Sequence, residues 1–340
     1  MKKLLVALFT LALALGPCAL AESIDIYTWD GYFEPEVLAQ FTEETGIEVN
    51  FSPFASNEDM LVVMETGAAY DVVLASDYAL SILRKDGLLQ PLDMDALSNY
   101  GNLDPSYLYQ YYDPDGEYTI PYAPGSPVLV YNPELVEGEI THFADLFDAQ
   151  FEDSVCLLDS ARVMIGYVNI MLGHDFNTTD DAELAEAAEK LAEIRPNVLA
   201  LDSNLAYQYL LSGEAKAAFL FTSQAVICEQ EMPGAFEYVF PAEGIGFGID
   251  AMVIPASANN PEGAHEFLNF LMRPEIAARI QPWTMYLNVN AAAAELLPEG
   301  SLDYQALNIP EELFATKQFA EDIGEYESVY QDIWAEFKLS

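Results

Sequence analysis

The chain has 340 residues, of which 52% are hydrophobic and 12% aromatic, a composition that excludes an intrinsically disordered protein. Acidic side chains outnumber basic ones by 56 to 12, and the formal net charge of −44 excludes nucleic acid as a partner through repulsion. The acidic residues are scattered along the chain, which indicates a solvated acidic surface that would also attract a cationic ligand.

The first 21 residues are typical of a secretory signal peptide. Lys2 and Lys3 precede an uncharged, apolar run over residues 4–15, which is too short to span a bilayer. The small-residue pattern Ala19-Leu20-Ala21 then offers a cleavage site. We therefore expect export to the periplasm or to the extracellular face of the membrane.

Lipid attachment at Cys18 is the alternative to simple cleavage after Ala21. Pro17 argues against it, because such signals usually carry Gly or Ala at that position. Cleavage would leave 319 residues (340 minus 21) with 10 basic and 56 acidic side chains, a net charge of −46. A chain of that length exceeds what one hydrophobic core usually serves, so we expect two lobes.

From residue 23 onward, strand and helix patterns alternate. Residues 23–29 alternate as a strand does, a helix is expected from Pro35 to a stop at Gly46, and residues 47–51 form the next strand. Ser56 caps a second helix, and the apolar residues 71–74 form a third strand. This β-α-β-α-β order predicts an α/β fold with a mostly parallel sheet and ligand loops at the strand ends.

A second α/β unit is expected after residues 118–132. Its elements are a strand over residues 155–158, a helix over 179–194 and a strand over 217–221. A further strand over residues 249–254 and a helix from Pro261 complete the pattern. Because no low-complexity linker separates the two units, we expect hinge crossovers between them.

Two cysteines remain after the predicted cleavage. Cys156 lies in an apolar, strand-like run and Cys228 in a helix-like one. An oxidising compartment permits a disulfide between them, and two buried free thiols are the equally consistent alternative.

Enzymatic and metal-binding templates are missing from the sequence. His142, His174 and His265 are far apart and form no zinc motif, and neither a phosphate-binding loop nor a nucleophile elbow is found. The segment 113–116 resembles the start of a calcium loop but lacks the further ligands, and a Pro-Asp-Gly turn explains it. We expect no enzyme activity, no cofactor and no metal.

A series of short motifs runs in order along nearly the whole mature chain. They are Tyr27-Thr28-Trp29-Asp30-Gly31-Tyr32, residues 41–47, Ala69-Tyr70-Asp71-Val72-Val73, residues 102–105, Ile120-Pro121-Tyr122, Arg195-Pro196-Asn197, Asp250-Ala251-Met252-Val253-Ile254-Pro255 and residues 267–274. Each motif alone is weak, but their order and spacing are specific. Together they are similar to the motifs of the periplasmic spermidine/putrescine-binding proteins of ABC transporters.

The resemblance implies a type II periplasmic binding-protein fold with two α/β lobes, a ligand cleft and hinge crossovers. One lobe would hold residues 22–125 and 249–294, and the other residues 126–248 and 295–340. A monomer would bind a polyamine in the cleft and deliver it to the membrane permease of an ABC transporter. A protein of this fold for another small solute, or a ligand-sensing receptor partner, would use the same cleft.

The candidate ligand site centres on Asp250. A lone carboxylate at the start of an apolar strand has little structural reason to be there, and Asp250 matches the family's amine-binding aspartate. Aromatic faces would surround the methylene chain of the ligand. The other positions that match the family's ligand-binding residues are Trp29, Tyr32, Ser76, Tyr78 and Tyr286, with capping of a helix as the alternative role of Ser76. Phe221 is a further candidate, at a position where the family has a pocket tryptophan.

Several positions depart from the family pattern. Ser160 and Val163 stand where the family usually has second-lobe acidic residues, which leaves Asp159 as the nearest carboxylate, while Gly248 replaces a pocket tryptophan and Ala320 a glutamine. Asp30 and Asp77 are two unusual first-lobe carboxylates that would compensate, with solvated loop aspartates as the alternative. The choice among putrescine, spermidine and another solute is therefore open.

Overall fold

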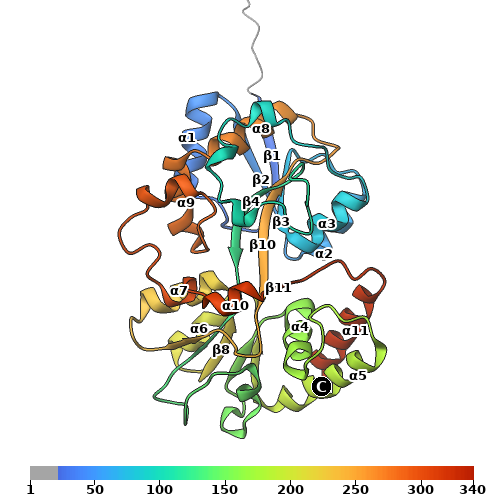
Figure 1. Cartoon of the computed structure of the whole chain (residues 1–340), viewed down its shortest axis with the longest axis vertical. Coiled ribbons are helices and arrows are strands. Elements are labelled where there is room, and N and C mark those ends of the chain that lie inside the picture. The colour runs from blue at the N-terminus through green and yellow to red at the C-terminus, as the bar shows by residue number, and fades with distance from the viewer. Residues whose placement is uncertain (1–21) are drawn as a thin grey trace, which may run out of the picture.

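The computed structural model describes residues 22–340 and forms two α/β lobes stacked along its long axis (Figure 1). Each lobe is built around its own sheet, and strand β10 (Gly246–Val253) runs between them. The predicted signal peptide and Cys18 lie outside the described residues. Within residues 22–340, no helix has the length and apolar character needed to cross a membrane.

The first sheet has six strands. They lie in the order β11-β10-β3-β1-β2, and β4 pairs with β10. Strands β1, β2 and β3 are parallel, whereas β10 is antiparallel to both β3 and β4. The bounds are β1 (Ser23–Thr28), β2 (Glu48–Pro53), β3 (Val72–Ser76), β4 (Ile120–Gly125) and β11 (Gln318–Phe319).

Local sequence signals set the ends of the first helices. Helix α1 (Pro35–Thr45) begins at a proline and ends at Gly46, whose φ of 76° lies in the left-handed region that glycine adopts without strain. Helix α2 (Asn57–Glu65) begins after Ser56, whose hydroxyl accepts the Asp59 amide. Helix α3 (Asp77–Lys85) follows β3 without an intervening loop.

The second sheet has five strands in the order β7-β6-β8-β5-β9. Strands β6, β7 and β8 are parallel, and β5 is antiparallel to its neighbours. The bounds are β5 (Val128–Tyr131), β6 (Val155–Leu157), β7 (Val198–Leu201), β8 (Ala217–Leu220) and β9 (Glu237–Val239). The helices of this part are α4 (Ala161–Leu172), α5 (Asp181–Ile194), α6 (Ala206–Ser212) and α7 (Thr222–Glu231).

The last third of the chain returns to both lobes. Helices α8 (Pro261–Leu271) and α9 (Pro274–Thr284) contribute to the core of the first sheet, and α10 (Glu311–Ala315) precedes β11. Helix α11 (Tyr326–Leu339) packs on α4 and α5 of the second lobe. Short 3-10 helices span Met94–Ala96, Tyr100–Asn102, Pro105–Tyr107, Phe143–Phe147, Ala149–Phe151, Arg195–Asn197, Ala291–Leu296 and Gln305–Leu307.

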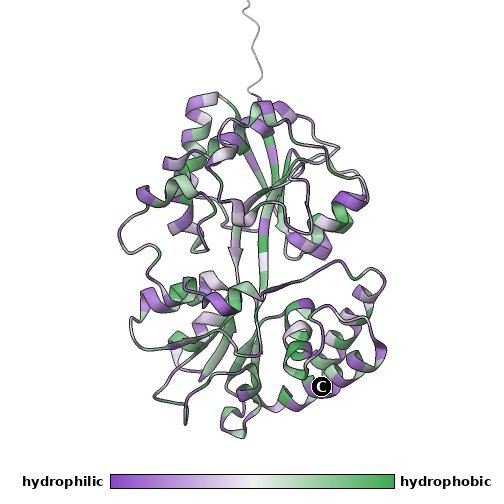
Figure 2. Cartoon of the chain, in the orientation of Figure 1, coloured by the Kyte–Doolittle hydropathy of each residue, from purple (hydrophilic) through white to green (hydrophobic). Residues whose placement is uncertain are grey.

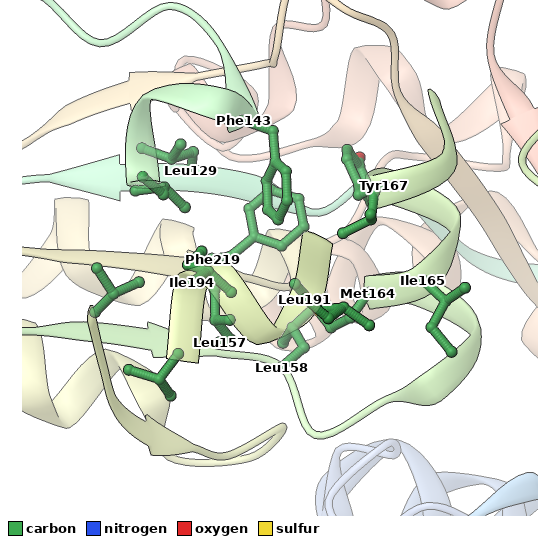
Figure 3. Packing of buried hydrophobic residues seen from close by; sticks show 14 of the residues in the cluster. Leu129, Phe143, Leu157, Leu158, Met164, Ile165, Tyr167, Leu191, Ile194 and Phe219 are labelled. Atoms are coloured by element: carbon green, nitrogen blue, oxygen red, sulfur yellow. The ribbon is translucent and has the colours of Figure 1, made fainter. Parts of the chain in front are cut away.

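Both lobes have apolar interiors. In the second lobe the ring of Phe219 lies 5.4 Å from that of Phe143 and 4.6 Å from that of Tyr167, centroid to centroid, with Leu157 and Leu158 close by (Figure 3). In the first lobe, α1, α8 and the strands bury a separate apolar cluster that includes Phe41. Hydrophobic residues follow the strands of both sheets, and hydrophilic residues mark the helix surfaces (Figure 2).

The predicted α/β class with two lobes is confirmed, but the start of one strand was predicted three residues too far along the chain. The prediction began it at residue 249, whereas β10 begins at Gly246, because Gly246 and Phe247 pair with β11 and Gly248 pairs with Gly125. Asp250 therefore lies inside a strand and not at its start. The predicted lobe boundaries stay a prediction, and we note that β11, from the segment assigned to the second lobe, pairs in the first sheet.

Candidate functional site

Asp250 is the centre of a hydrogen-bonded cluster on β10. The hydroxyl of Tyr32 donates to Asp250 Oδ2 at 2.5 Å, and the hydroxyl of Ser76 donates to Asp250 Oδ1 at 2.7 Å. Burial raises the pKa of Asp250 above its ordinary value, while these two donors act in the opposite direction. Each carboxylate oxygen can accept a further bond, so the group can still receive a donor from a ligand.

Ser76 lies at the end of β3, directly opposite Asp250 in the antiparallel register. It occupies the N-cap position of α3, but its side chain accepts no hydrogen bond from that helix. The alternative role of Ser76 as a helix cap is therefore wrong, because its hydroxyl is engaged by Asp250.

Asp77 is buried, with 2% of its surface exposed. Its Oδ1 accepts the backbone amide of Tyr78 at 2.8 Å, and its Oδ2 accepts that of Ile249 at 3.3 Å. Burial is the largest cause that raises the pKa of Asp77 well above its ordinary value, and the charge of Asp250 adds to it. The alternative of a solvated loop aspartate is wrong for Asp77, whereas Asp30 is solvent-exposed after β1.

Two of the predicted aromatic residues surround this end of the sheet. Trp29 packs edge-on against Phe54 with ring centroids 4.4 Å apart, and its indole nitrogen is buried without a hydrogen-bond partner. The ring of Tyr32 stacks on that of Tyr122 at 6.2 Å. Burial and the charge of Asp250 raise the pKa of Tyr32 well above its ordinary value, so this phenol remains a proton donor.

Tyr286 lies where the two lobes meet. A Cβ atom on Gly125 would come within 2.8 Å of the Tyr286 ring and 2.5 Å of the hydroxyl of Thr222, at the start of α7. Burial, followed by the charge of Asp250, raises the pKa of Tyr286 to about 12. The structure thus brings Tyr286 to the Asp250 cluster, while Phe221, at the N-cap of α7, packs against the apolar core of the second lobe.

Tyr78 is buried, but its hydroxyl is directed away from Asp250. It donates to Glu58 Oε1 at 2.8 Å, and the guanidinium of Arg162 lies 5.5 Å from the centroid of the Tyr78 ring. The structure thus brings Tyr32, Ser76, Asp77 and Tyr286 to Asp250. The other four predicted site residues lie elsewhere: Tyr78 donates to Glu58, Asp30 is exposed, Trp29 packs against Phe54 and Phe221 packs in the second-lobe core.

The second-lobe carboxylate left by the sequence, Asp159, is engaged by the C-terminal helix. The indole of Trp334 donates to Asp159 Oδ1 at 2.7 Å, and Lys338 Nζ lies 3.2 Å from the same oxygen. Ser160 is the N-cap residue of α4, and Val163 packs against the second-lobe core. The second lobe therefore presents no counterpart to Asp250 at these positions.

Arg162 is a residue that the sequence reasoning missed. Its side chain is 3% exposed, pairs with Glu327 Oε2 at 2.8 Å and donates to Asn177 Oδ1 at 2.9 Å. The guanidinium lies between the rings of Tyr78 and Tyr330. A single basic residue in the otherwise uncharged segment 161–172 was the available signal, because burying such a charge requires specific partners.

A second missed contact crosses to the segment around Ala320. The hydroxyl of Tyr111 donates to the backbone oxygen of Ala320 at 2.6 Å, and Lys85 on α3 pairs with Asp322 Oδ2 at 2.6 Å. The Tyr111 contact uses the backbone of residue 320, so the side chain there could not have revealed it.

The described residues show no group of three or more His, Cys, Asp or Glu side chains arranged to hold a metal ion. Each histidine of residues 22–340 lies away from the Asp250 cluster. His265 accepts the Asp93 amide, His142 lies beside Thr141, and His174 lies beside Glu186. The arrangement around Asp250 suits recognition of a cation by hydrogen bonds and aromatic faces.

Comparisons with known proteins find relatives along nearly the whole chain. Residues 36–307 match the family model described as "Bacterial extracellular solute-binding protein". The chain is 34% identical over 334 residues to the spermidine/putrescine-binding periplasmic protein of Salmonella typhimurium, with 96% of each chain covered.

Solved structures show the same fold. The spermidine/putrescine ABC transporter substrate-binding protein PotD from Streptococcus pneumoniae has a TM-score of 0.80 at 31% identity, covering 94% of this chain and 99% of the other. A structure from Listeria monocytogenes has a TM-score of 0.88 at 33% identity, with coverage of 94% and 99%. The predicted binding-protein fold is confirmed.

Proposed function

This chain belongs to the family of bacterial extracellular solute-binding proteins, and we propose that it captures a small cationic amine outside the cytoplasmic membrane and passes it to an ABC importer without changing it chemically. The observation that carries this proposal is Asp250, a partly buried carboxylate held by Tyr32 and Ser76 in a strand between the lobes.

The electrostatics of the cluster favour a cation. A carboxylate taken out of water is costly unless a positive group pairs with it, and both Asp250 and Asp77 have pKa values raised by burial. A ligand ammonium would supply the missing charge and form charge-assisted hydrogen bonds. The rings of Trp29, Tyr32 and Tyr286 would offer their faces to the ammonium and its methylene chain.

Capture without chemistry is supported by the groups that surround Asp250. Its partners are a phenol, whose pKa lies above its ordinary range, and a serine hydroxyl. The three histidines of residues 22–340 contact other groups, so none of these imidazoles can act as a general base at Asp250. The relatives named for spermidine and putrescine binding cover nearly the whole chain, which favours a polyamine over other solutes. Delivery to a permease and export through the predicted signal are part of the same proposal.

The lobes would move as units around the ligand. We assign residues 22–125 and 249–294 to one lobe and residues 126–248 and 295–340 to the other, with β10 and the link from β4 to β5 as hinge segments. Tyr286 and Thr222 meet at Gly125, so closure would seal the site at this point.

Isothermal titration calorimetry with putrescine, spermidine and spermine tests the proposal. The wild-type protein should bind at least one of them, and Asp250→Asn should weaken binding by about 10-fold to 100-fold because a charge-assisted bond is lost. Asp332→Asn, at an exposed position on α11, is the matched control and should bind as the wild type does. No binding of any amine, or equal affinity in Asp250→Asn, would contradict the proposal.

A further inference from the structure

We propose that the site selects a short diamine, with one ammonium at Asp250 and the other at Asp77, in the space left open by Gly248. The proposal rests on the amine-binding function proposed above and specifies its substrate class. Both cation-binding carboxylates would then come from the first lobe, and a longer polyamine would be disfavoured.

The backbone brings Asp77 and Asp250 close to each other. Asp250 pairs with Ser76 in the antiparallel register of β10 and β3, and Asp77 is the next residue after Ser76. Directly opposed residues in such a ladder have Cα atoms about 4.5–5.5 Å apart, and consecutive Cα atoms are about 3.8 Å apart, so the Cα atoms of Asp77 and Asp250 lie at most about 9 Å from each other. In addition, Asp77 Oδ2 accepts the amide of Ile249, the neighbour of Asp250.

Gly248 leaves room between these groups. Residues i and i+2 of a strand project to the same face, so a side chain at position 248 would stand on the face from which Asp250 projects. A Cβ atom built on Gly248 would meet only Asp77 Oδ2, at 4.0 Å. The distance along β10 from Gly248 to Asp250 is roughly 7 Å, from the rise of 3.3–3.4 Å per residue, which suits a ligand with closely spaced nitrogens.

Asp77 has too few partners for a buried carboxylate. Two backbone amides contact it, one of them at 3.3 Å, and within residues 22–340 no lysine or arginine is hydrogen-bonded to it. Burial, followed by the charge of Asp250, keeps the pKa of Asp77 raised, although the two amides and the charge of Arg162 act in the opposite direction. A second ammonium in the space at Gly248 would balance this charge, so that two cationic groups would meet two carboxylates.

The second lobe limits the length of the ligand. Asp159 is engaged by Trp334 and Lys338, and Ser160 and Val163 carry no charge. The charged group that the second lobe brings close to Asp77 is the guanidinium of Arg162, which lies over the ring of Tyr78. A third ammonium extending toward α4 would meet the guanidinium of Arg162, whose carboxylate partner Glu327 is already engaged, and at positions 159, 160 and 163 the one carboxylate, Asp159, is engaged as well.

Calorimetric titration of the wild-type protein with n-butylamine, 1,3-diaminopropane, putrescine and spermidine provides the first test. The diamine that binds more tightly should have an affinity at least about 10-fold higher than that of n-butylamine and that of spermidine. A diamine pairs with both carboxylates, whereas n-butylamine pairs with only one and spermidine extends toward Arg162. If spermidine binds as tightly as that diamine, or if the monoamine does, the proposal is wrong. Absence of binding by all four amines would instead contradict the amine-binding function.

Two variants locate the second ammonium. Asp77→Asn should weaken diamine binding about 10-fold or more and leave n-butylamine unchanged, whereas Asp250→Asn should weaken both. Gly248→Val should fill the open space and reduce diamine affinity to that of n-butylamine. Gly101→Val, at a glycine with no atom within 4 Å of an added Cβ, is the matched control and should bind diamine as the wild type does. Equal loss of monoamine and diamine binding in Asp77→Asn, or unchanged diamine binding in Gly248→Val, would overturn the assignment.

Discussion

The hydroxyl of Ser76 donates to Asp250 Oδ1 at 2.7 Å, across the pair of antiparallel strands that brings these two residues opposite each other. The next residue, Asp77, begins helix α3. Ser76 therefore holds the position that would ordinarily cap this helix, but its hydroxyl is hydrogen-bonded to a carboxylate on β10 instead. The pairing of β3 with β10 therefore sets the geometry of the site, although 174 positions separate the two residues in sequence.

Tyr32→Phe should weaken amine binding by several-fold. The substitution removes the phenol that donates to Asp250 Oδ2, so the charged form of Asp250 loses one of its two side-chain donors and its pKa rises further. Calorimetry with putrescine at pH 7 measures the loss, and the affinity deficit should shrink at higher pH as the carboxylate ionises. Tyr109→Phe, at an exposed tyrosine, is the control. Unchanged affinity in Tyr32→Phe would show that this hydrogen bond does not support the ligand.

The sequence predicted much of the first lobe, because its signals there are local. Proline at the start of α1, glycine at its end and the serine cap of α2 act within a few residues. The start of β10 was placed too late, because its two glycines carry no strand pattern and are held there by pairing with β4 and β11. Strand pairing between distant segments is not visible in a local pattern.

The candidate site shows the same contrast between features that a local sequence pattern predicts and features that depend on distant segments. Asp250, Tyr32 and Ser76 were predicted from position and resemblance, and the structure brings them into one hydrogen-bonded group. Arg162 was missed because its partners Glu327 and Asn177 lie in other segments of the chain. The sequence left open whether Asp77 is buried or solvated, because its contact with the amide of Ile249 joins two distant segments of the chain.

Asp77→Asn should make the ligand-free protein more stable than the wild type, and this difference should grow as the pH rises. The pKa of Asp77 is raised in the folded state, so its contribution to stability is fully present below the ordinary aspartate pKa and is lost as the pH rises through the raised value. Asparagine has no such charge to bury. Melting temperatures from pH 4 to pH 8 should show a widening advantage for the variant, of about 2–4 °C at the upper end. Asp30→Asn, at an exposed position, should show none; a constant difference for Asp77→Asn would contradict the assignment of its raised pKa.

Glu327→Gln should destabilise the protein by roughly 1–3 kcal/mol, because the nearly buried guanidinium of Arg162 loses its carboxylate partner. Denaturant unfolding measures the change. Glu325→Gln, at an exposed glutamate two residues away, is the matched control and should stay within about 0.5 kcal/mol of the wild type. Equal stability of Glu327→Gln and the wild type would show that Asn177 and the backbone suffice to hold Arg162.

Cys156 and Cys228 should resist alkylation in the folded protein. Both are buried free thiols, and burial raises the pKa of each to about 12, so little reactive thiolate exists at pH 8. Native protein treated with iodoacetamide should remain unmodified at both positions by mass spectrometry, and unfolding in guanidinium chloride should expose both. A reducing agent should leave the melting temperature unchanged, whereas a reduction-dependent shift would indicate a disulfide.

Gly166→Ala should have two opposing effects on stability, and the size of each is known. Alanine in a helix interior is ordinarily more stable than glycine by about 1 kcal/mol. Here an added Cβ would lie 2.4 Å from the ring of Phe176, which is buried and packs edge-on against Tyr167 with ring centroids 6.0 Å apart. Overpacking of a buried site typically costs about 1–3 kcal/mol, so we expect net destabilisation in denaturant unfolding. The double variant Gly166→Ala, Phe176→Leu should recover part of the loss, because the shorter side chain yields the space. If Gly166→Ala alone is more stable than the wild type, the packing of Phe176 between α4 and β10 is looser than its burial indicates.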